Sequence, residues 1–170
     1  YDSPLGAGTG AAVIFGTTGG VMEAALRTVA EVVLGEEIAD VEYNDVRGME
    51  QTREAVIKVG EAEVKIAVVH TLASAKKMLD RIKEGTADYH FIEVMACPGG
   101  CIGGGGQPVP VNAEIRQKRR EALFECDRAN ELRKSHENPE IKVLYDTWLG
   151  KPLGEKAHSL LHTHYSEQKR

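Results

Sequence analysis

The hydrophobic and polar positions of the first 95 residues predict alternating helices and strands. Residues 1–18 are a loop rich in Gly and Thr that contains one apolar stretch, 11–15. A helix is predicted over 21–34, and Gly35 is a fitting residue to end it. Its apolar residues recur at helical spacing: Met22, Ala25, Leu26, Val29, Val32 and Val33.

Three strand candidates follow this helix. The weakest runs over 41–47. Residues 54–59 alternate, and Gly60-Glu61 then turns the chain into a strand over 62–70, so this spacing predicts a hairpin. The first strand of the hairpin places three apolar residues on one face: Ala55, Ile57 and Val59.

A strand, a helix and a second strand then form a predicted βαβ unit. The apolar run 66–69 is typical of a strand buried on both faces. The helix is predicted over 72–84 and the next strand over 89–95. Ligands of such sheets gather beyond the carboxyl ends of the strands. The residues predicted to face inward from the helix are Leu72, Ala75, Leu79 and Ile82.

Beyond Pro110 the pattern becomes helical and charged. We predict helices over 113–134, from Pro139 to Leu149, and over 153–162. Basic residues of the first of these helices alternate with glutamates, which favours a solvated face. This all-helical tail is expected to form a separate layer or subdomain.

Composition narrows the function classes. There are 18 glycines, and 12 of them fall within 6–20 and 99–106, which suggests two places where the backbone wraps a ligand. The net charge of −5 argues against nucleic acid as the main partner. No apolar run is long enough for a membrane span, and no secretory signal opens the chain. The chain starts at Tyr1 without a methionine, and we expect it to be a piece of a longer protein.

The segment from Met95 to Pro108 carries the strongest chemical signal. Cys97 and Cys101 lie four residues apart at a strand end, and four consecutive glycines follow. Thiolates are ligands for iron–sulfur clusters, zinc and copper(I), and glycines allow backbone N–H groups to approach a cluster closely. Two thiolates cannot complete a four-coordinate site, so further ligands must come from elsewhere. Two loop cysteines without a metal remain an alternative, and zinc is less favoured because no second cysteine pair exists.

Other motifs carry weaker signals. The glycines from Gly6 to Gly20 precede a helix but match neither the phosphate-binding loop nor the dinucleotide fingerprint, so a tight turn against a cofactor or a second lobe is favoured. His70 and His90 lie at strand ends and are expected to be satisfied by local hydrogen bonds. His158 and His162 have helical spacing, but no matching Asp, Glu or Cys accompanies them to make a metal site.

Several of these segments resemble the FeFe-hydrogenases. The run from Phe15 to Thr28 is similar to a stretch of that family, as is Val46-Arg47-Gly48. The run from His90 to Pro108 resembles the cysteine motif that seats the active-site H-cluster. The tail, from Arg133 through His162-Thr163-His164-Tyr165, resembles the family's small subunit.

This resemblance implies a fold, a division of the chain into two regions, and a cofactor. The expected fold is one α/β lobe of the H-cluster domain, a mixed sheet with flanking helices, over residues 1–111, followed by a helical small-subunit-like region over 112–170. The H-cluster is a four-iron cubane joined through one cysteine to a two-iron unit with CO, cyanide and a dithiolate. It is where protons and dihydrogen are interconverted, and further iron–sulfur clusters are expected in the missing N-terminal regions.

The resemblance also implies roles for individual residues. Cys97 corresponds to the cysteine that holds the cubane, and Cys101 to the one that bridges the cubane and the two-iron unit. Met95, Phe15 and Gly16 correspond to residues that line the pocket, where a thioether and an aromatic ring would give a dry wall. The residues expected to wrap the cofactor with backbone include Gly103 and Gly104.

Some motifs of the family are absent from this chain, and their absence leads to further expectations about activity and partners. Two further cubane cysteines, a proton-relay cysteine and a cyanide-binding lysine of the family lie in no segment of this chain, so we expect it to be inactive by itself. The N-terminal remainder of the same subunit is an expected partner. The tail and Ile102-Gly103 resemble multisubunit NAD(P)-linked hydrogenases, which implies iron–sulfur and flavin-containing NAD(P)H-oxidising subunits in the cytoplasm of an anaerobe.

Two other functions stay open. Hydrogenase-like proteins of iron–sulfur cluster assembly share a similar cysteine motif but lack hydrogenase activity, and they scaffold clusters. The fused small-subunit-like tail favours a hydrogenase over this alternative. A metal-free structural fragment is the third possibility.

Overall fold

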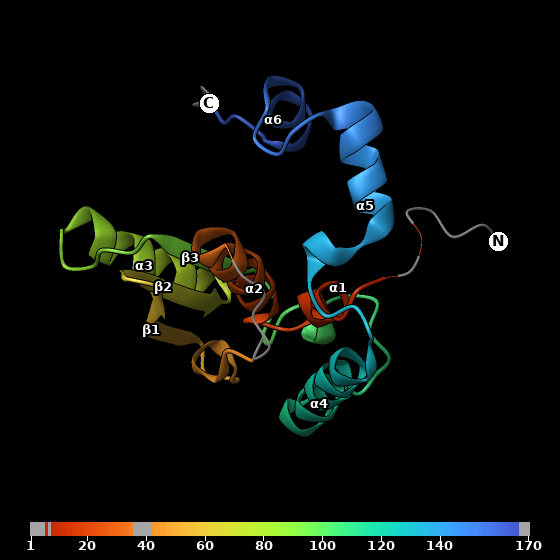
Figure 1. Cartoon of the computed structure of the whole chain (residues 1–170). Helices are drawn as coiled ribbons and strands as arrows, with labels where there is room; N and C mark the ends of the chain where they lie inside the picture. Colours follow the sequence, from red (N-terminus) through yellow and green to blue (C-terminus); the bar gives the residue numbers. More distant parts are fainter. Residues whose placement is uncertain (1–5, 7, 36–41, 167–170) are drawn as a thin grey trace. The chain divides into compact units, whose positions relative to one another are not determined.

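The computed structural model describes residues 6, 8–35 and 42–166 (Figure 1). The chain divides into two compact units. Gly8–Ser135 forms one, and the other comprises the residues from His136 onward with the first residues of the chain. Each unit is described by itself below. The predicted division between residues 111 and 112 stays a prediction.

The larger unit is built around a mixed three-stranded sheet of order β1-β2-β3. β1 (Thr52–Val59) and β2 (Ala62–His70) form the predicted hairpin, in a register that pairs Thr52 with Val69 and Val59 with Ala62. β3 (Phe91–Met95) is parallel to β2, with Ile66 opposite Phe91. This pairing confirms the βαβ unit. The carboxyl ends of β2 and β3 meet where His70 is opposite Met95.

Helices cover both faces of this sheet (Figure 1). α2 (Gly20–Leu34) packs Met22, Leu26 and Ala30 on one face, against side chains of β1 and β2. α3 (Leu72–Lys83) packs on the other face. The predicted double burial of β2 is therefore confirmed, because its four apolar residues are each at most 1% exposed: Ile66, Ala67, Val68 and Val69.

The inward face of α3 agrees with the predicted one in part. Ala75 is buried and Ile82 packs against the core as predicted, but Leu72 and Leu79 are 66% and 55% exposed, and Ser74 and Met78 are buried instead. The first turn of the helix is fixed by hydrogen bonds. The Thr71 hydroxyl accepts from the Ser74 N–H at 3.3 Å, and the Ser74 hydroxyl donates to Gln51 Oε1 at 3.1 Å.

α2 also departs from the apolar stripe that its sequence suggested. Val29 and Val32 are 44% and 73% exposed, while Glu23 and Arg27 are completely buried. Gly35 ends the helix as predicted, with a left-handed φ of +68°. An ion-pair network inside the larger unit thus takes the place of part of the expected apolar face.

Two segments predicted as loop or strand are helical. The apolar stretch before α2 forms α1 (Gly10–Val13) and a 3-10 helix, Ile14–Gly16. The predicted strand over 41–47 is wrong for its described part, which contains a 3-10 helix, Asn44–Val46; residue 41 lies outside the described residues. This helix buries Val46 to 1% exposure and directs Arg47 to Glu23 at 2.7 Å, contacts that outweigh the strand propensity of the segment.

The charged helix is shorter than predicted and is tied to α2. α4 (Ala113–Ala129) begins at the cap Asn112 and ends before Asn130, so Arg133 and Lys134 lie beyond it. Asp127 of α4 is fully buried and accepts from Arg27 at 2.7 Å and from Arg133 at 2.6 Å. Lys134, 5% exposed, pairs with Glu31. The prediction that the basic residues of 113–134 form a solvated face is therefore wrong for Arg133 and Lys134.

The smaller unit is helical, as predicted. A 3-10 helix, Ser135–Glu137, begins at the last residue of the larger unit and leads into α5 (Pro139–Leu144), which continues as a π-helical turn, Tyr145–Leu149. Pro139 occupies the first turn of α5, where its missing N–H costs nothing. α6 (Glu155–Leu161) follows. Among the described residues, no helix has the length and apolarity needed to cross a membrane.

Candidate functional site

The cysteine motif forms a compact loop directly after β3. Cys97 is half-buried and Cys101 is exposed, and both thiols are free. A 3-10 helix, Cys101–Gly103, closes the loop. The N–H groups of Gly100, Gly103 and Gly104 donate to the carbonyls of Cys97, Gly100 and Cys101, at 3.0, 3.0 and 3.1 Å. These three amides build the loop itself and do not point at a sulfur ligand.

The loop is anchored by the ends of its two neighbouring strands. The Thr71 N–H donates to the Met95 carbonyl at 2.8 Å. His70, 4% exposed, accepts from the Gly99 N–H through Nδ1 at 3.3 Å and lies 3.2 Å from the Met49 carbonyl through Nε2. These two partners select the neutral tautomer with the proton on Nε2.

The predicted satisfaction of both strand-end histidines is confirmed, but their partners are distant in sequence. His90 Nδ1 accepts from the Lys65 N–H at 2.9 Å on the adjacent strand. His70 positions the cysteine loop, a role that sequence reasoning missed. Its place at the end of a buried strand, beside the strand that carries the cysteines, was the available signal.

The two glycine-rich segments meet at Gly100. The Thr18 N–H donates to the Gly99 carbonyl at 2.9 Å. A Cβ on Gly100 would lie 2.7 Å from Met95 Sδ, 2.9 Å from Thr18 N and 3.1 Å from Gly16 O. Gly100 also has a φ of +93°, which L side chains rarely adopt. The structure thus brings Met95, Gly16 and the cysteine loop together.

The turn that carries Phe15 is packed tightly on its other sides. A Cβ on Gly16 would lie 2.9 Å from Leu123 Cδ1, and one on Gly20 would overlap the Ile14 carbonyl. The Phe15 side chain itself is 46% exposed. The Thr17 side chain is completely buried, and its hydroxyl has no hydrogen-bond partner within the described residues. The turn therefore has a fixed backbone and an open aromatic ring.

Glu93 of β3 fixes the start of α2 against the sheet. Its carboxylate is 6% exposed and accepts from the N–H groups of Gly19 at 2.6 Å and Met22 at 2.8 Å. These N–H groups belong to the helix terminus, which favours a negative charge. Burial raises the pKa of Glu93, and the hydrogen bonds and Arg53 offset this rise only in part. Sequence reasoning predicted this strand but missed the role of Glu93.

The space around the thiols suits a thiolate-bound cluster. A Cβ on Gly104 would lie 3.3 Å from Cys97 Sγ and 3.4 Å from the Cys101 carbonyl, so a larger residue would crowd the sulfur. The two thiols are the soft donors that an iron–sulfur cluster takes. Residues Cys97 and Cys101 therefore fit such a group, but they supply only part of its ligands.

A complete metal site is not found within the described part of the chain. No three His, Cys, Asp or Glu side chains are grouped closely enough there to hold an ion. Cys126 lies on α4 and is exposed. On α6, His158 and His162 approach through their Nδ1 atoms at 2.5 Å, with both side chains exposed.

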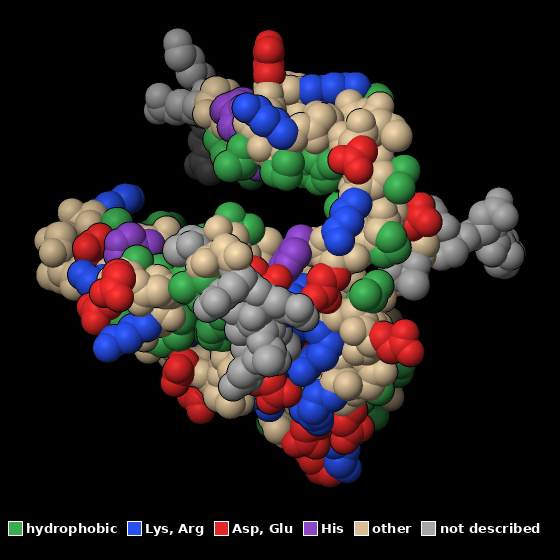
Figure 2. All heavy atoms as spheres, in the orientation of Figure 1, with side chains coloured by type: hydrophobic (Ala, Val, Ile, Leu, Met, Phe, Trp, Pro, Cys, Tyr) green, Lys and Arg blue, Asp and Glu red, His purple; other side chains and the backbone are tan. Residues whose placement is uncertain are grey.

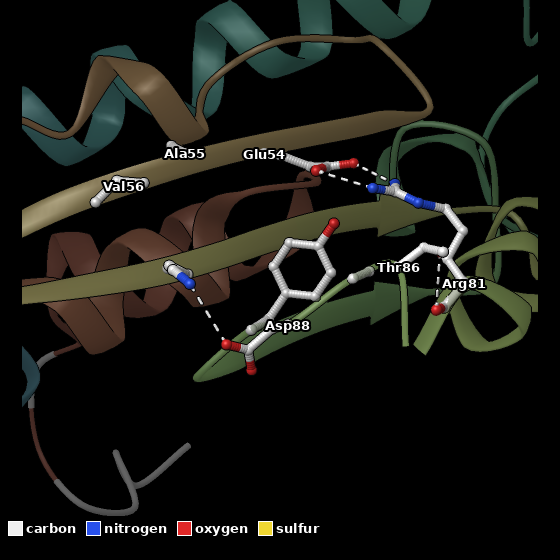
Figure 3. Close-up of a pocket in the computed structure, with 9 residues that line it drawn as sticks. Glu54, Ala55, Val56, Arg81, Thr86 and Asp88 are labelled. Carbon is white, nitrogen blue, oxygen red and sulfur yellow. Dashed lines mark hydrogen bonds and ion pairs between the residues drawn. The ribbon is translucent and has the colours of Figure 1, made fainter. Parts of the chain in front are cut away.

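A separate cavity of about 360 Å³ lies beside the hairpin (Figure 3). Its charged side chains are paired with one another: Glu54 with Arg81 at 2.5 Å, and Lys65 with Asp88 at 3.4 Å. None of the predicted site residues lines it. This cavity is therefore distinct from the cysteine loop.

Known families match nearly the whole chain. Residues 1–105 match the family described as iron only hydrogenase large subunit, C-terminal domain, and residues 113–168 match the iron hydrogenase small subunit. The chain is 53% identical to the NADP-reducing hydrogenase subunit HndD of Solidesulfovibrio fructosivorans, over 100% of this chain and 29% of that protein. It is 32% identical to the cytosolic iron–sulfur assembly component 3 of Rattus norvegicus, over 88% of this chain and 31% of that protein.

Solved structures agree with these matches. An FeFe-hydrogenase HydA1 from Chlamydomonas reinhardtii superposes with a TM-score of 0.72 and 43% identity, over 97% of this chain and 48% of that one. The chain thus spans about three tenths of the length of these curated relatives. With the fold, the cysteine loop and the family match in agreement, the chain belongs to the family of the iron-only hydrogenase large subunit, C-terminal domain.

Proposed function

We propose that this chain is the C-terminal part of the catalytic subunit of an FeFe-hydrogenase, which reversibly oxidises dihydrogen and reduces protons. One observation carries the proposal: the loop with Cys97 and Cys101 is seated on the turn before α2, with Gly100 pressed against Met95 Sδ and Gly16 O. Cys97 is proposed to hold the cubane of the H-cluster. Cys101 is proposed to bridge the cubane and the two-iron unit.

The bound H-cluster would supply an open iron site at which protons and dihydrogen interconvert. The chain's own residues would hold and enclose it. Gly104 leaves space beside the Cys97 thiolate that a larger residue would fill, and Gly103 lets the backbone of the loop pass close to the Pro98 carbonyl. The Met95 thioether and the open ring of Phe15 would exclude water from the cluster and present polarizable atoms to it. His70 and Glu93 would act only as positioning residues.

The rest of the subunit and its partners complete the proposal. Residues 1–111 would belong to the H-cluster domain and 112–170 to the small-subunit-like region. The missing cluster ligands would come from the N-terminal remainder of the same subunit. The name of the HndD relative, an NADP-reducing hydrogenase subunit, supports a multisubunit complex. Its other subunits would be iron–sulfur and flavin-containing NAD(P)H-oxidising proteins. A cytoplasmic location is the last part of the proposal.

Serine substitutions in the intact subunit test the cluster ligands. Cys97→Ser and Cys101→Ser should each abolish hydrogen evolution, because serine replaces a soft thiolate ligand with a hydroxyl. Cys126→Ser removes an exposed thiol from α4 and is the matched control, which should keep the iron content and the activity of the unaltered protein. Full activity in either loop variant would contradict the proposed ligand roles.

A cluster-assembly function is the second candidate, favoured by the similarity to the assembly component. The match of residues 113–168 to the hydrogenase small subunit supports a hydrogenase instead. Infrared spectra of the intact, iron-loaded subunit separate the two functions. A hydrogenase should show CO and cyanide bands, and an assembly protein should show none.

A further inference from the structure

A cavity between α4 and the 3-10 helix Asn44–Val46 lies outside the site described above. It measures about 360 Å³. Figure 2 shows that basic and acidic side chains gather over the part of the larger unit where α4 lies. The cavity itself is mostly basic, and its lining residues are Asn44, Arg47, Arg120, Glu121, Phe124 and Arg128.

The aromatic ring of Phe124 organises two of these arginines. Phe124 is 4% exposed. The guanidinium of Arg47 lies 4.3 Å from the ring centroid, and that of Arg120 lies 5.2 Å from it. Contact with the ring holds each guanidinium in place, and its N–H groups can still donate hydrogen bonds in the plane of the guanidinium.

The two arginines differ in how their charge is compensated. Arg47 donates to both oxygens of Glu23 at 2.7 and 2.8 Å and to Glu42 at 3.1 Å. Nε of Arg120 is buried and has no hydrogen-bond partner among the described residues. Burial and the nearby Arg47 lower the pKa of Arg120, and the nearby glutamates offset this only in part.

The nearby carboxylates, Glu121 among them, offset the positive charge around Arg120 only in part. Arg128 adds a third guanidinium. Glu121 is the acidic lining residue, and it is exposed and accepts from Gln117 at 2.7 Å. By contrast Arg119, one position before Arg120, is held by the carbonyls of Ile102 and Pro108 at 2.9 and 2.7 Å. Arg119 thus has partners in the fold, whereas Arg120 faces a cavity.

We infer that this cavity binds an oxyanion, a carboxylate or a phosphate, through the guanidinium groups of Arg120 and Arg128. A buried donor without a partner costs free energy, and a guanidinium is the side chain best shaped to bind the paired oxygens of such anions. The anion has two possible sources: a free phosphate-type ligand, or an acidic side chain from the remainder of the subunit. The site is independent of the cysteine loop and of the proposed hydrogenase activity.

Calorimetric titration of inorganic phosphate into the intact subunit tests the first source. The unaltered protein should bind phosphate, and Arg120→Gln and Arg128→Gln should each weaken binding at least about tenfold, since each removes a charged donor. Lys118→Gln is the matched control. It removes the same charge from an exposed ion pair with Glu114 on the same helix and should change binding less than about twofold.

Thermal unfolding in buffer without phosphate tests the second source. If an acidic side chain fills the cavity, phosphate will not bind, and Arg120→Gln and Arg128→Gln will both lower the Tm several degrees more than Lys118→Gln. Arg128 is exposed, so its substitution leaves the packing of α4 intact. Absence of phosphate binding, together with Tm values equal to that of the Lys118→Gln control, would overturn the inference.

Discussion

Gly100 is a residue at which the two glycine-rich segments meet. Its backbone has φ +93° and ψ −157°, a conformation that costs a residue with a side chain about 1–3 kcal/mol. Its missing Cβ also leaves room for Met95 Sδ and for the main chain at Gly16 and Thr18. Because Gly100 has no Cβ, the cysteine loop can contact the turn before α2, and the proposed cluster site depends on this contact.

Alanine at this position should therefore destabilise the loop. We expect Gly100→Ala to lower the free energy of unfolding of the intact subunit by about 2–4 kcal/mol, from strain and overlap together. Gly105→Ala is the matched control, because a Cβ there would have no neighbour within 4 Å. Denaturant titrations measure both variants, and equal losses in the two would contradict the role given to Gly100.

At the scale of the elements, Glu93 connects β3 to the start of α2. Because burial raises its pKa above the ordinary value, the folded state binds this proton more tightly than the unfolded state does. Its contribution to stability is therefore largest at low pH. It falls as the pH rises from the ordinary glutamate value, about 4.3, through the raised pKa of the folded state.

The difference between the unaltered protein and Glu93→Gln isolates this titration. The free energy of unfolding of the unaltered protein, relative to that of the variant, should decrease across this pH range and then level off. Denaturant titrations between about pH 4 and 8 measure it. The comparison cancels groups with the opposite sign, such as Glu54, whose pKa is lowered by Arg81. A difference that rises with pH would contradict the assignment.

The buried network of α2 and α4 permits a second prediction for these elements. Burial raises the pKa of Asp127, but hydrogen bonds from Arg27 and Arg133 outweigh it and hold the pKa below its ordinary value. Asp127→Asn removes a charged partner of the fully buried Arg27 and should cost about 3–5 kcal/mol of unfolding free energy.

The control for Asp127 is an exposed pair on the same helix. Glu114→Gln breaks the ion pair with Lys118, whose side chains are 73% and 66% exposed, and should cost less than about 1 kcal/mol. Both variants can be compared by denaturant unfolding of the intact subunit. A loss below 1 kcal/mol in Asp127→Asn would show that the network adds nothing to stability.

The same network explains which parts of the fold the sequence could not predict. The hairpin and β2 followed from alternation and from the apolar run, because those residues pack against near neighbours in the sheet. The burial of Glu23 and Arg27 on α2 depends on Asp127, about one hundred residues away, so no local pattern contains it. The helical Asn44–Val46 segment depends on the same contacts through Arg47.

The candidate site was predictable to a similar degree. Cys97 and Cys101 stand out by their spacing and by the glycines that follow, and the resemblance supplied their roles. The cysteine loop is held in place by long-range hydrogen bonds, from the Gly99 N–H to His70 and from the Thr18 N–H to the Gly99 carbonyl. Such pairs join residues that share no periodicity or motif, so only the folded chain reveals them.

For the whole molecule, the division of ligands determines what the isolated chain can do. The loop offers two thiols, and the described residues contain no group of three metal-binding side chains. We therefore expect the 170-residue chain, after incubation with iron, sulfide and a preformed two-iron unit, to evolve no hydrogen and to show no CO or cyanide bands. The intact subunit, treated identically, should do both. Circular dichroism of the isolated chain establishes that it is folded during the assay, and hydrogen evolution by that folded chain would refute the expected sharing of ligands between the two parts of the subunit.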